Sequence, residues 1–344
     1  MTDFFSSLAA IAAAIFGLGI LMVVHETGHY AAARAFGMRV IKFSLGMAPV
    51  LWRFRPKNSP TTFQIGAIPF FAYVQIAGMN PLEEVPENDK GSYANASLFG
   101  RIVTIVAGSL ANYLVASVFF FGSILLNGMV TTVVRVIPDR PAAQAGLRDN
   151  DKVVEVDGVP VERSNEVRTL IMQRPGKATP LVVERNGERQ SLTVTPVPAG
   201  EKGEGQVGVE FIPARVSLSE ATAEAVLTPP RVVADVVRGL GRLITGKQKA
   251  ELGGPVAIVK EGAKAAKAGA GLMLWFLGYL STSLAAFNLL PIPALDGGRL
   301  IFLGYEAVTR RRPDAMVEAH VHLVGFFMLL ALMVVVTYGD IFKH

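Results

Sequence analysis

The chain has 344 residues, of which 51% are hydrophobic, and its mean hydropathy is +0.41. These values are too apolar for a typical soluble protein and favour a membrane protein. The net charge is +5, but no stacking motif or basic helix accompanies it, so nucleic acid is not an expected partner. The chain has no cysteine, which excludes disulfides and thiolate metal ligands.

Apolar blocks predict a helical polytopic membrane protein with about four transmembrane helices. The expected spans are about 4–34, 101–130, 269–290 and 320–338, the last being the shortest. In chain order we expect a first span within 1–37, then a cytoplasmic-side, membrane-associated β region in 38–100 and a second span in 101–130. An extracytoplasmic α+β domain in 131–213 and an amphipathic linker in 214–268 are expected to follow. The chain is then expected to form a third span within 269–298, a cytoplasmic loop or helix in 299–319 and a fourth span within 320–344.

The first block is better interpreted as an uncleaved span than as a cleaved signal peptide. Its first residues include Asp3 and neither Lys nor Arg, and its apolar stretch continues beyond the length of a signal-peptide core.

The pentad His25-Glu26-Thr27-Gly28-His29 lies at the end of this block. On a helix, histidines four residues apart share one face and can bind one zinc ion, which leaves Glu26 free to act as a general base. Ionisable residues in a membrane span are costly and usually serve a function. The placement therefore predicts a metalloprotease that works inside a membrane.

Residues 38–80 are apolar and rich in β-favouring side chains, and the turn residues Pro56, Asn58 and Pro60 divide them. We expect β-hairpins, with Ile65 to Gly78 dipping into the membrane face. An edge strand beside a metal could accept an extended substrate segment by β-addition. The alternative is an interfacial loop that only packs against the protein.

Residues 131–213 show the pattern of a small α+β domain. Val133 to Ile137 predicts a strand, Pro141 to Leu147 a short helix and turn, and Leu181 to Val194 a hairpin whose Asn186-Gly187 turn suits type I′ geometry. The Ala-Gly-Leu and Val-Asp-Gly elements resemble bacterial PDZ modules. Such a domain could bind a peptide terminus or could exclude substrates with large exterior domains.

Residues 218–246 carry apolar side chains at helical spacing, with arginines among them. This pattern predicts an amphipathic helix on the outer leaflet or against the PDZ-like domain, and a linker helix packed on protein is an equal alternative.

The distribution of Lys and Arg predicts the topology. Positive residues follow the first span and lie between the third and fourth spans, whereas the extreme N-terminus has none. Since positive residues near spans mark the cytoplasmic side, the N-terminus and residues 131–268 are expected to be extracytoplasmic.

This topology predicts the third metal ligand. His25 lies 17 residues beyond Leu8, about 25 Å along a helix and near the cytoplasmic boundary. The third span reaches Asp296 near the same boundary, and Pro291 and Pro293 must unwind the helix there. Two histidines, a carboxylate and an open fourth position are typical of catalytic zinc.

The pentad, Asn288-x-x-Pro-x-Pro-x-Leu-Asp296-Gly and a domain between the second and third spans together resemble the site-2 protease family. The likeness is strongest to its bacterial RseP-type members. The resemblance implies zinc bound by His25, His29 and Asp296, with Glu26 activating the water. It also implies the bacterial inner membrane and cleavage of single-span membrane proteins, such as anti-sigma factors already cut by another protease.

The resemblance extends to residues expected to contact substrate. Gly108 and Asn112 match a short Gly-x-x-x-Asn element, and Asn112 lies about 15 Å along the helix from Arg101, a depth compatible with the metal. Asn112 and Asn288 are expected to hold the substrate backbone or the oxyanion.

The sequence departs from the family pattern in two respects. It has room for one PDZ module, whereas relatives often have two. Phe70-Phe71-Ala72-Tyr73-Val74 replaces a Gly-Gly-Tyr-Val-like stretch, and Tyr73 is still expected to contact substrate.

Two functions from other classes stay open on the sequence alone. An ion or zinc transporter also carries polar residues in its spans, and a scaffold could use the PDZ-like domain to hold partners. The intact Glu26 and the third ligand disfavour both. His320 and His322 lack further ligands and are interpreted as solvated histidines, not a second metal site.

Overall fold

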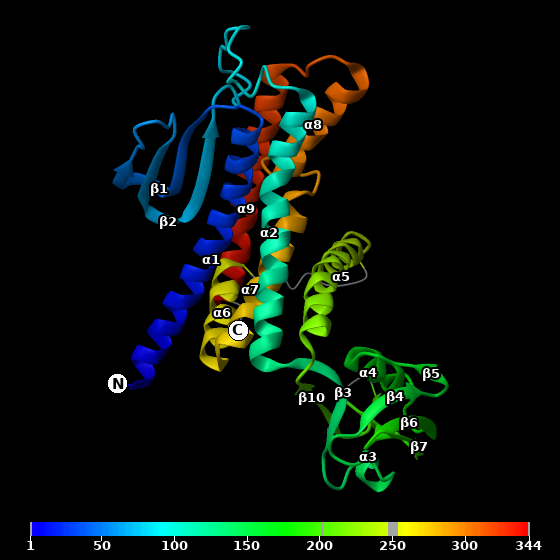
Figure 1. Cartoon of the computed structure of the whole chain (residues 1–344). Coiled ribbons are helices and arrows are strands. Elements are labelled where there is room, and N and C mark those ends of the chain that lie inside the picture. The colour runs from blue at the N-terminus through cyan, green and yellow to red at the C-terminus, as the bar shows by residue number, and fades with distance from the viewer. Residues whose placement is uncertain (1, 201–202, 247–253, 343–344) are drawn as a thin grey trace. The chain divides into compact units, whose positions relative to one another are not determined.

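The computed structural model describes residues 2–200, 203–246 and 254–342 and divides into two compact units (Figure 1). The first, termed the membrane unit, comprises Met1–Ser123 and Ala223–His344. The second, termed the inserted unit, comprises Ile124–Thr222. Each unit is described separately below.

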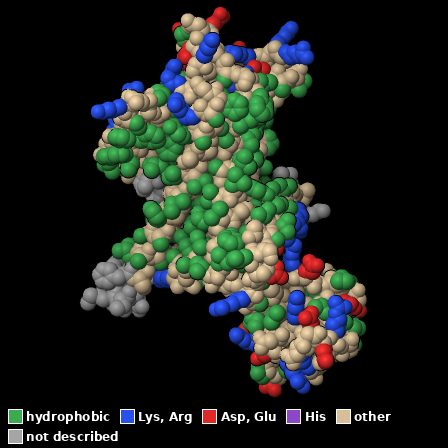
Figure 2. Space-filling model, viewed as in Figure 1, with side chains coloured by type: hydrophobic (Ala, Val, Ile, Leu, Met, Phe, Trp, Pro, Cys, Tyr) green, Lys and Arg blue, Asp and Glu red, His purple; other side chains and the backbone are tan. Residues whose placement is uncertain are grey.

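Four helices of the membrane unit are long and apolar enough to cross a bilayer, as the sequence predicted. They are α1 (Thr2–Ala35), α2 (Leu98–Asn127), α7 (Ala270–Asn288) and α9 (Ala315–Phe342). Figure 2 shows the broad apolar surface over these helices, with Lys and Arg gathered at the end that carries α8.

The last helix is longer than expected, so the prediction that it is the shortest span is wrong. It begins at Ala315 because the side chain of Asp314 accepts the backbone N–H groups of Met316 and Val317, which caps the first turn. The shortest of the four is α7, with 19 residues.

The predicted β region forms strands β1 (Val40–Phe54) and β2 (Thr62–Ile76), which pair antiparallel. The strands bend, so residues 40–45 pair with residues 72–76 on one side and with residues 62–65 on the other. Residues 72–76 therefore form an outer edge. Tyr30 of α1 holds the sheet by packing edge-on against Phe43, with 5.8 Å between ring centroids.

The membrane unit has two further helices, of which α6 (Pro255–Ala268) was not expected and α8 (Asp296–Thr309) overlaps the loop or helix expected over 299–319. Helix α6 lies in the predicted linker, and α8 follows the third span. The Asp340 carboxylate of α9 accepts the N–H groups of Gly254 and Ala257, which caps the start of α6. The amphipathic helix expected over 218–246 is α5 (Leu218–Ile244).

The inserted unit contains an antiparallel sheet with strand order β10-β3-β4-β6-β7. Its elements are β3 (Met129–Val136), α3 (Pro141–Gln144), β4 (Lys152–Val156), β5 (Val159–Pro160), α4 (Ser164–Met172), β6 (Thr179–Arg185), β7 (Glu188–Val194), β8 (Val197–Ala199), β9 (Glu204–Gln206) and β10 (Val209–Ala214). Val134, Val153 and Val183 belong to its buried core. Asn186 and Gly187 both have positive φ, as the type I′ turn requires.

A buried ion pair stabilises the inserted unit. The Arg185 guanidinium donates to both carboxylate oxygens of Asp151 at 2.7 Å, and the Arg148 backbone N–H donates to the same group. Burial raises the pKa of Asp151, but the hydrogen bonds from Arg185 and Arg148 together lower it by more. The pKa of Asp151 therefore lies below its usual value. The ionised form of Asp151 therefore stabilises the fold.

We expect Asp151→Asn to lower the stability of the inserted unit at neutral pH, because the substitution removes the negative charge that pairs with the Arg185 guanidinium. Hydrogen exchange of residues 124–222 in the intact protein measures this as faster exchange in the variant.

The difference in stability between the wild type and Asp151→Asn should decrease as the pH is lowered. Because the folded pKa of Asp151 is lowered, its contribution is complete above pH ~4 and is lost as the pH falls through the folded value. Equal protection in both proteins at neutral pH would show that the pair contributes nothing.

Candidate metal centre

The two histidines of the pentad lie in the last third of α1, one turn apart and facing the same point. Both are buried, with 8% of each residue exposed. Their Nε2 atoms are 3.1 Å apart, and their rings meet edge-on. The i, i+4 spacing on a helix is sufficient to produce this arrangement.

Asp296 joins them from the start of α8. Its Oδ2 atom lies 3.2 Å from His25 Nε2 and 3.3 Å from His29 Nε2. Helix α7 ends at Asn288, and the chain around Pro291 and Pro293 is not helical, as predicted, and turns tightly before α8. Gly297 permits this turn, because a Cβ there would lie 2.0 Å from the Leu290 carbonyl oxygen.

The triangle of Nε2, Nε2 and Oδ2 atoms fits a metal ion. Ligand atoms of a tetrahedral zinc site with bonds near 2.05 Å are separated by about 3.3 Å. His29 Nδ1 lies 2.8 Å from the carbonyl oxygen of Thr104, which can only accept, so Nδ1 carries the proton and Nε2 presents a lone pair. Oδ2 of Asp296 accepts no hydrogen bond among the described residues. A cation at the centre satisfies these converging acceptors.

Helix α2 supports both imidazoles from behind. Besides Thr104, it supplies Asn112, which is fully buried and whose amide nitrogen lies 3.5 Å from His25 Nδ1. Gly108 lies directly under the His29 ring, where a Cβ would be 2.3 Å from Nε2. The close approach is reciprocal, because a Cβ on Gly28 would be 2.2 Å from the Ala107 carbonyl oxygen.

The remaining predicted site residues lie on the other side of the triangle. The half-buried Asn288 ends α7, and its amide nitrogen is 3.5 Å from His25 Nε2. The backbone N–H of Val74, on the sheet's outer edge, lies near the Glu26 carboxylate. Tyr73 is partly exposed on the same edge, and its hydroxyl accepts a hydrogen bond from Gln64 Nε2 at 3.0 Å.

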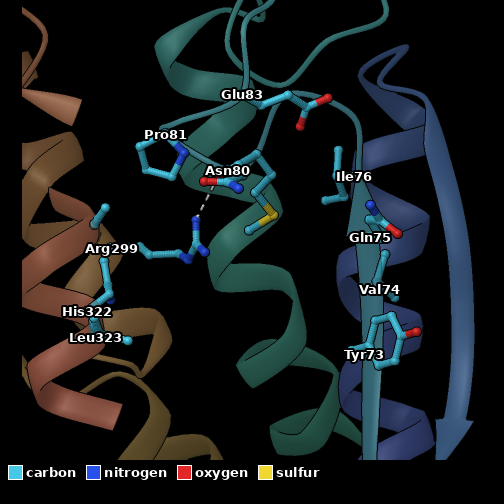
Figure 3. A pocket seen from close by; sticks show the side chains of 12 residues that line it. Tyr73, Val74, Gln75, Ile76, Asn80, Pro81, Glu83, Arg299, His322 and Leu323 are labelled. Atoms are coloured by element: carbon cyan, nitrogen blue, oxygen red, sulfur yellow. Dashed lines mark hydrogen bonds between the residues drawn. The ribbon is translucent and has the colours of Figure 1, made fainter. Parts of the chain in front are cut away.

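A cleft of about 560 Å³ extends from this edge (Figure 3). Residues 73–76 of the outer strand line one side, and His322 and Leu323 of α9 line the other. Arg299 reaches across and donates to the Met79 carbonyl oxygen at 3.3 Å. The cleft thus lies along residues 73–76 of the outer strand.

His322 differs from the sequence interpretation, which treated it and His320 as solvated. His320 is exposed and bonds only within its own helix. His322 is half-buried, and its Nδ1 accepts the backbone N–H of Ala294 at 3.0 Å, two residues before Asp296. No sequence signal identifies this contact, because it joins a helix to a loop 28 residues earlier.

Comparisons with known proteins identify the family of the chain. The profile of peptidase family M50 matches residues 13–332. A Clostridium perfringens protein provisionally named a zinc metalloprotease is 32% identical, over 95% of this chain and 97% of its own. The zinc metalloprotease RasP of Geobacillus kaustophilus is 29% identical, over 98% and 99% of the two chains. The protein named "Probable protease eep" of Enterococcus faecalis is 28% identical, over 94% and 96%.

One solved structure, the PDZ domain of an SdrC-like protein from Listeria monocytogenes, is also similar in part. It is 22% identical, with a TM-score of 0.22, over 25% of this chain and 87% of that one.

We expect Gly108→Ala to weaken zinc binding by about 10- to 100-fold, the usual effect of disturbing a residue that orients a metal ligand. The added methyl group must displace the His29 ring, because it would lie 2.3 to 2.8 Å from three atoms of that ring. Elemental analysis after dialysis against a graded zinc buffer measures the loss.

Gly19→Ala is the matched control, since it lies in α1 and a Cβ there meets no atom within 4 Å. Unchanged zinc affinity in Gly108→Ala would contradict the predicted crowding of His29.

Proposed function

Because the chain belongs to peptidase family M50, the site-2 protease family, we propose that it is a zinc-dependent endopeptidase that cleaves membrane-spanning segments of single-span proteins. The proposed zinc ligands are His25, His29 and Asp296. The supporting observation is the triangle of three ligand atoms, 3.1 to 3.3 Å apart, at the end of an apolar helix. Few arrangements other than a metal site stabilise such a cluster at that depth.

Zinc in a site with an open fourth position acts as a Lewis acid that polarises a carbonyl and acidifies water. Glu26 is the general base in our proposal. Its carboxylate takes a proton from the attacking water and later delivers it to the leaving amine. The Val74 N–H lies near this carboxylate, and Glu26 adjoins the metal ligand His25 in the chain, so the proposed base stands beside the metal site.

The outer edge of the sheet is proposed to receive the substrate. A peptide bond in a helix is shielded by its own hydrogen bonds and must be extended before water can attack. Residues 72–76 offer an unpaired strand edge next to Glu26, to which an extended segment can add as a further strand. Tyr73 lies on this edge, and Asn288 lies at the open side of the metal ligands, where an amide N–H₂ can donate to a developing oxyanion.

For Asn112 the geometry favours a role different from the substrate contact that the sequence suggested. A histidine that binds zinc through Nε2 donates Nδ1–H to a neighbouring acceptor. Oδ1 of Asn112 is buried and has no partner among the described residues, and a half-turn of the amide brings it to His25 Nδ1. We propose that Asn112 orients His25, as the Thr104 carbonyl orients His29.

The topology and partners follow from the charge distribution and the family. We propose a bacterial inner-membrane protein with its N-terminus and inserted unit extracytoplasmic. The inserted unit, proposed to be a PDZ domain, binds a peptide terminus or excludes substrates whose exterior domains have not yet been removed. Anti-sigma factors already cut by another protease are the proposed substrates.

We expect Glu26→Gln to retain zinc but to lose turnover, because glutamine preserves the size of the side chain and cannot accept the proton. Loss of a general base lowers the rate by about 10²- to 10⁴-fold. Mass spectrometry of fragments from single-span proteins reconstituted with the enzyme in vesicles measures cleavage.

Asp296→Asn provides the contrasting variant, since it should lower bound zinc as well as turnover. Cleavage at the normal rate by Glu26→Gln would refute the assignment of the base. Metal flux across the same sealed vesicles without cleavage would favour a transporter.

A further inference from the structure

We propose that α9 positions the third zinc ligand, and that His322 and Gly325 form the brace that does so. The brace acts on Pro293 and Ala294, which directly precede Leu295 and Asp296. His322 is thus a positioning residue for the metal centre, not a ligand of it. The inference rests on the zinc site proposed above and adds to it a residue on a helix that supplies none of its ligands.

The loop that carries Asp296 has a conformation that needs support. Ala294 has φ +70°, in the left-handed region that residues with a Cβ rarely adopt. Such a conformation persists where the surroundings fix it. The Ala294 N–H points to α9, where His322 Nδ1 accepts it at 3.0 Å.

A second contact comes from the same face of α9. Gly325 lies three residues after His322, so both project to one side of the helix. A Cβ on Gly325 would be 2.3 Å from Pro293 Cβ and 2.8 Å from its carbonyl carbon. Among the described residues of α9, Gly325 is buried, whereas most of its neighbours on the helix are exposed apolar residues. The loop therefore packs directly on the α9 backbone at the point where His322 holds it.

The chemistry of the hydrogen bond fixes what a replacement must provide. A backbone N–H only donates, so Nδ1 accepts and the neutral ring carries its proton on Nε2. An asparagine Oδ1 occupies nearly the position of histidine Nδ1 and also accepts. Leucine fills a similar volume but accepts nothing, which leaves the Ala294 N–H without its partner.

The test measures metal binding by the full-length protein in detergent, independently of proteolysis. Zinc affinity is obtained by competition with a chelator, and the visible absorption of the Co²⁺-substituted protein reports the ligand geometry. We expect His322→Leu to bind zinc about tenfold more weakly, and to show a shifted or weakened Co²⁺ spectrum, because Asp296 is no longer held. His322→Asn should stay within about twofold of the wild type with an unchanged spectrum.

Two further variants separate the brace from a general effect on α9. His320→Leu is the matched control, because His320 lies on the same helix, is exposed and bonds only to the Met316 carbonyl, so its metal binding should be unchanged. Gly325→Ala disturbs the loop through the other contact and should change the spectrum in the same direction as His322→Leu. It provides the test even where His322→Leu does not fold, as judged by circular dichroism.

The proposal is overturned if His322→Leu or Gly325→Ala matches the wild type in affinity and spectrum. It is also overturned if His322→Asn is as damaging as His322→Leu, since the acceptor would then be irrelevant. Failure of the underlying zinc site would look different, because the wild-type protein itself would bind neither zinc nor Co²⁺.

Discussion

The structure depends on bringing three electron-rich atoms together in an apolar setting. Two imidazole nitrogens and a carboxylate oxygen, 3.1 to 3.3 Å apart, repel one another unless a cation lies between them. The low polarity around a membrane helix strengthens both that repulsion and the attraction to the cation that relieves it. Much of the surrounding fold can be understood as the means of keeping these atoms at their positions.

The supports come from two elements and use different interactions. Helix α2 approaches α1 so closely that glycines are required on both, and it presents the Thr104 carbonyl to His29. The outer strand of the sheet places the Val74 backbone N–H near the Glu26 carboxylate. Because backbone groups of Thr104 and Val74 face His29 and Glu26, secondary structure as well as side chains sets the surroundings of one ligand and of the proposed base.

The clustering of His25, His29 and Asp296 could be predicted from sequence because each part follows a local or one-dimensional rule. Helical spacing pairs His25 with His29, and hydropathy with charge bias gives the depth of Asp296. The same rules do not indicate that Gly108 makes room for a ring, since this depends on how closely two helices approach. Nor do they identify α6, whose 14 residues are too short for a span and whose cap, Asp340, comes from the other end of the chain.

The strand edge and the metal centre are linked through Glu26, and this link bears on how the enzyme could avoid cleaving its surroundings. Lipid-embedded helices of other proteins expose no backbone donors or acceptors, so they cannot add to the edge at residues 72–76. In the proposed mechanism, a segment that unwinds would exchange its internal hydrogen bonds for bonds to this edge, close to Glu26. Recognition of an extended backbone would then coincide with arrival at the proposed base. Selectivity for segments that unwind easily would follow from this geometry without a side-chain pocket for any one residue type.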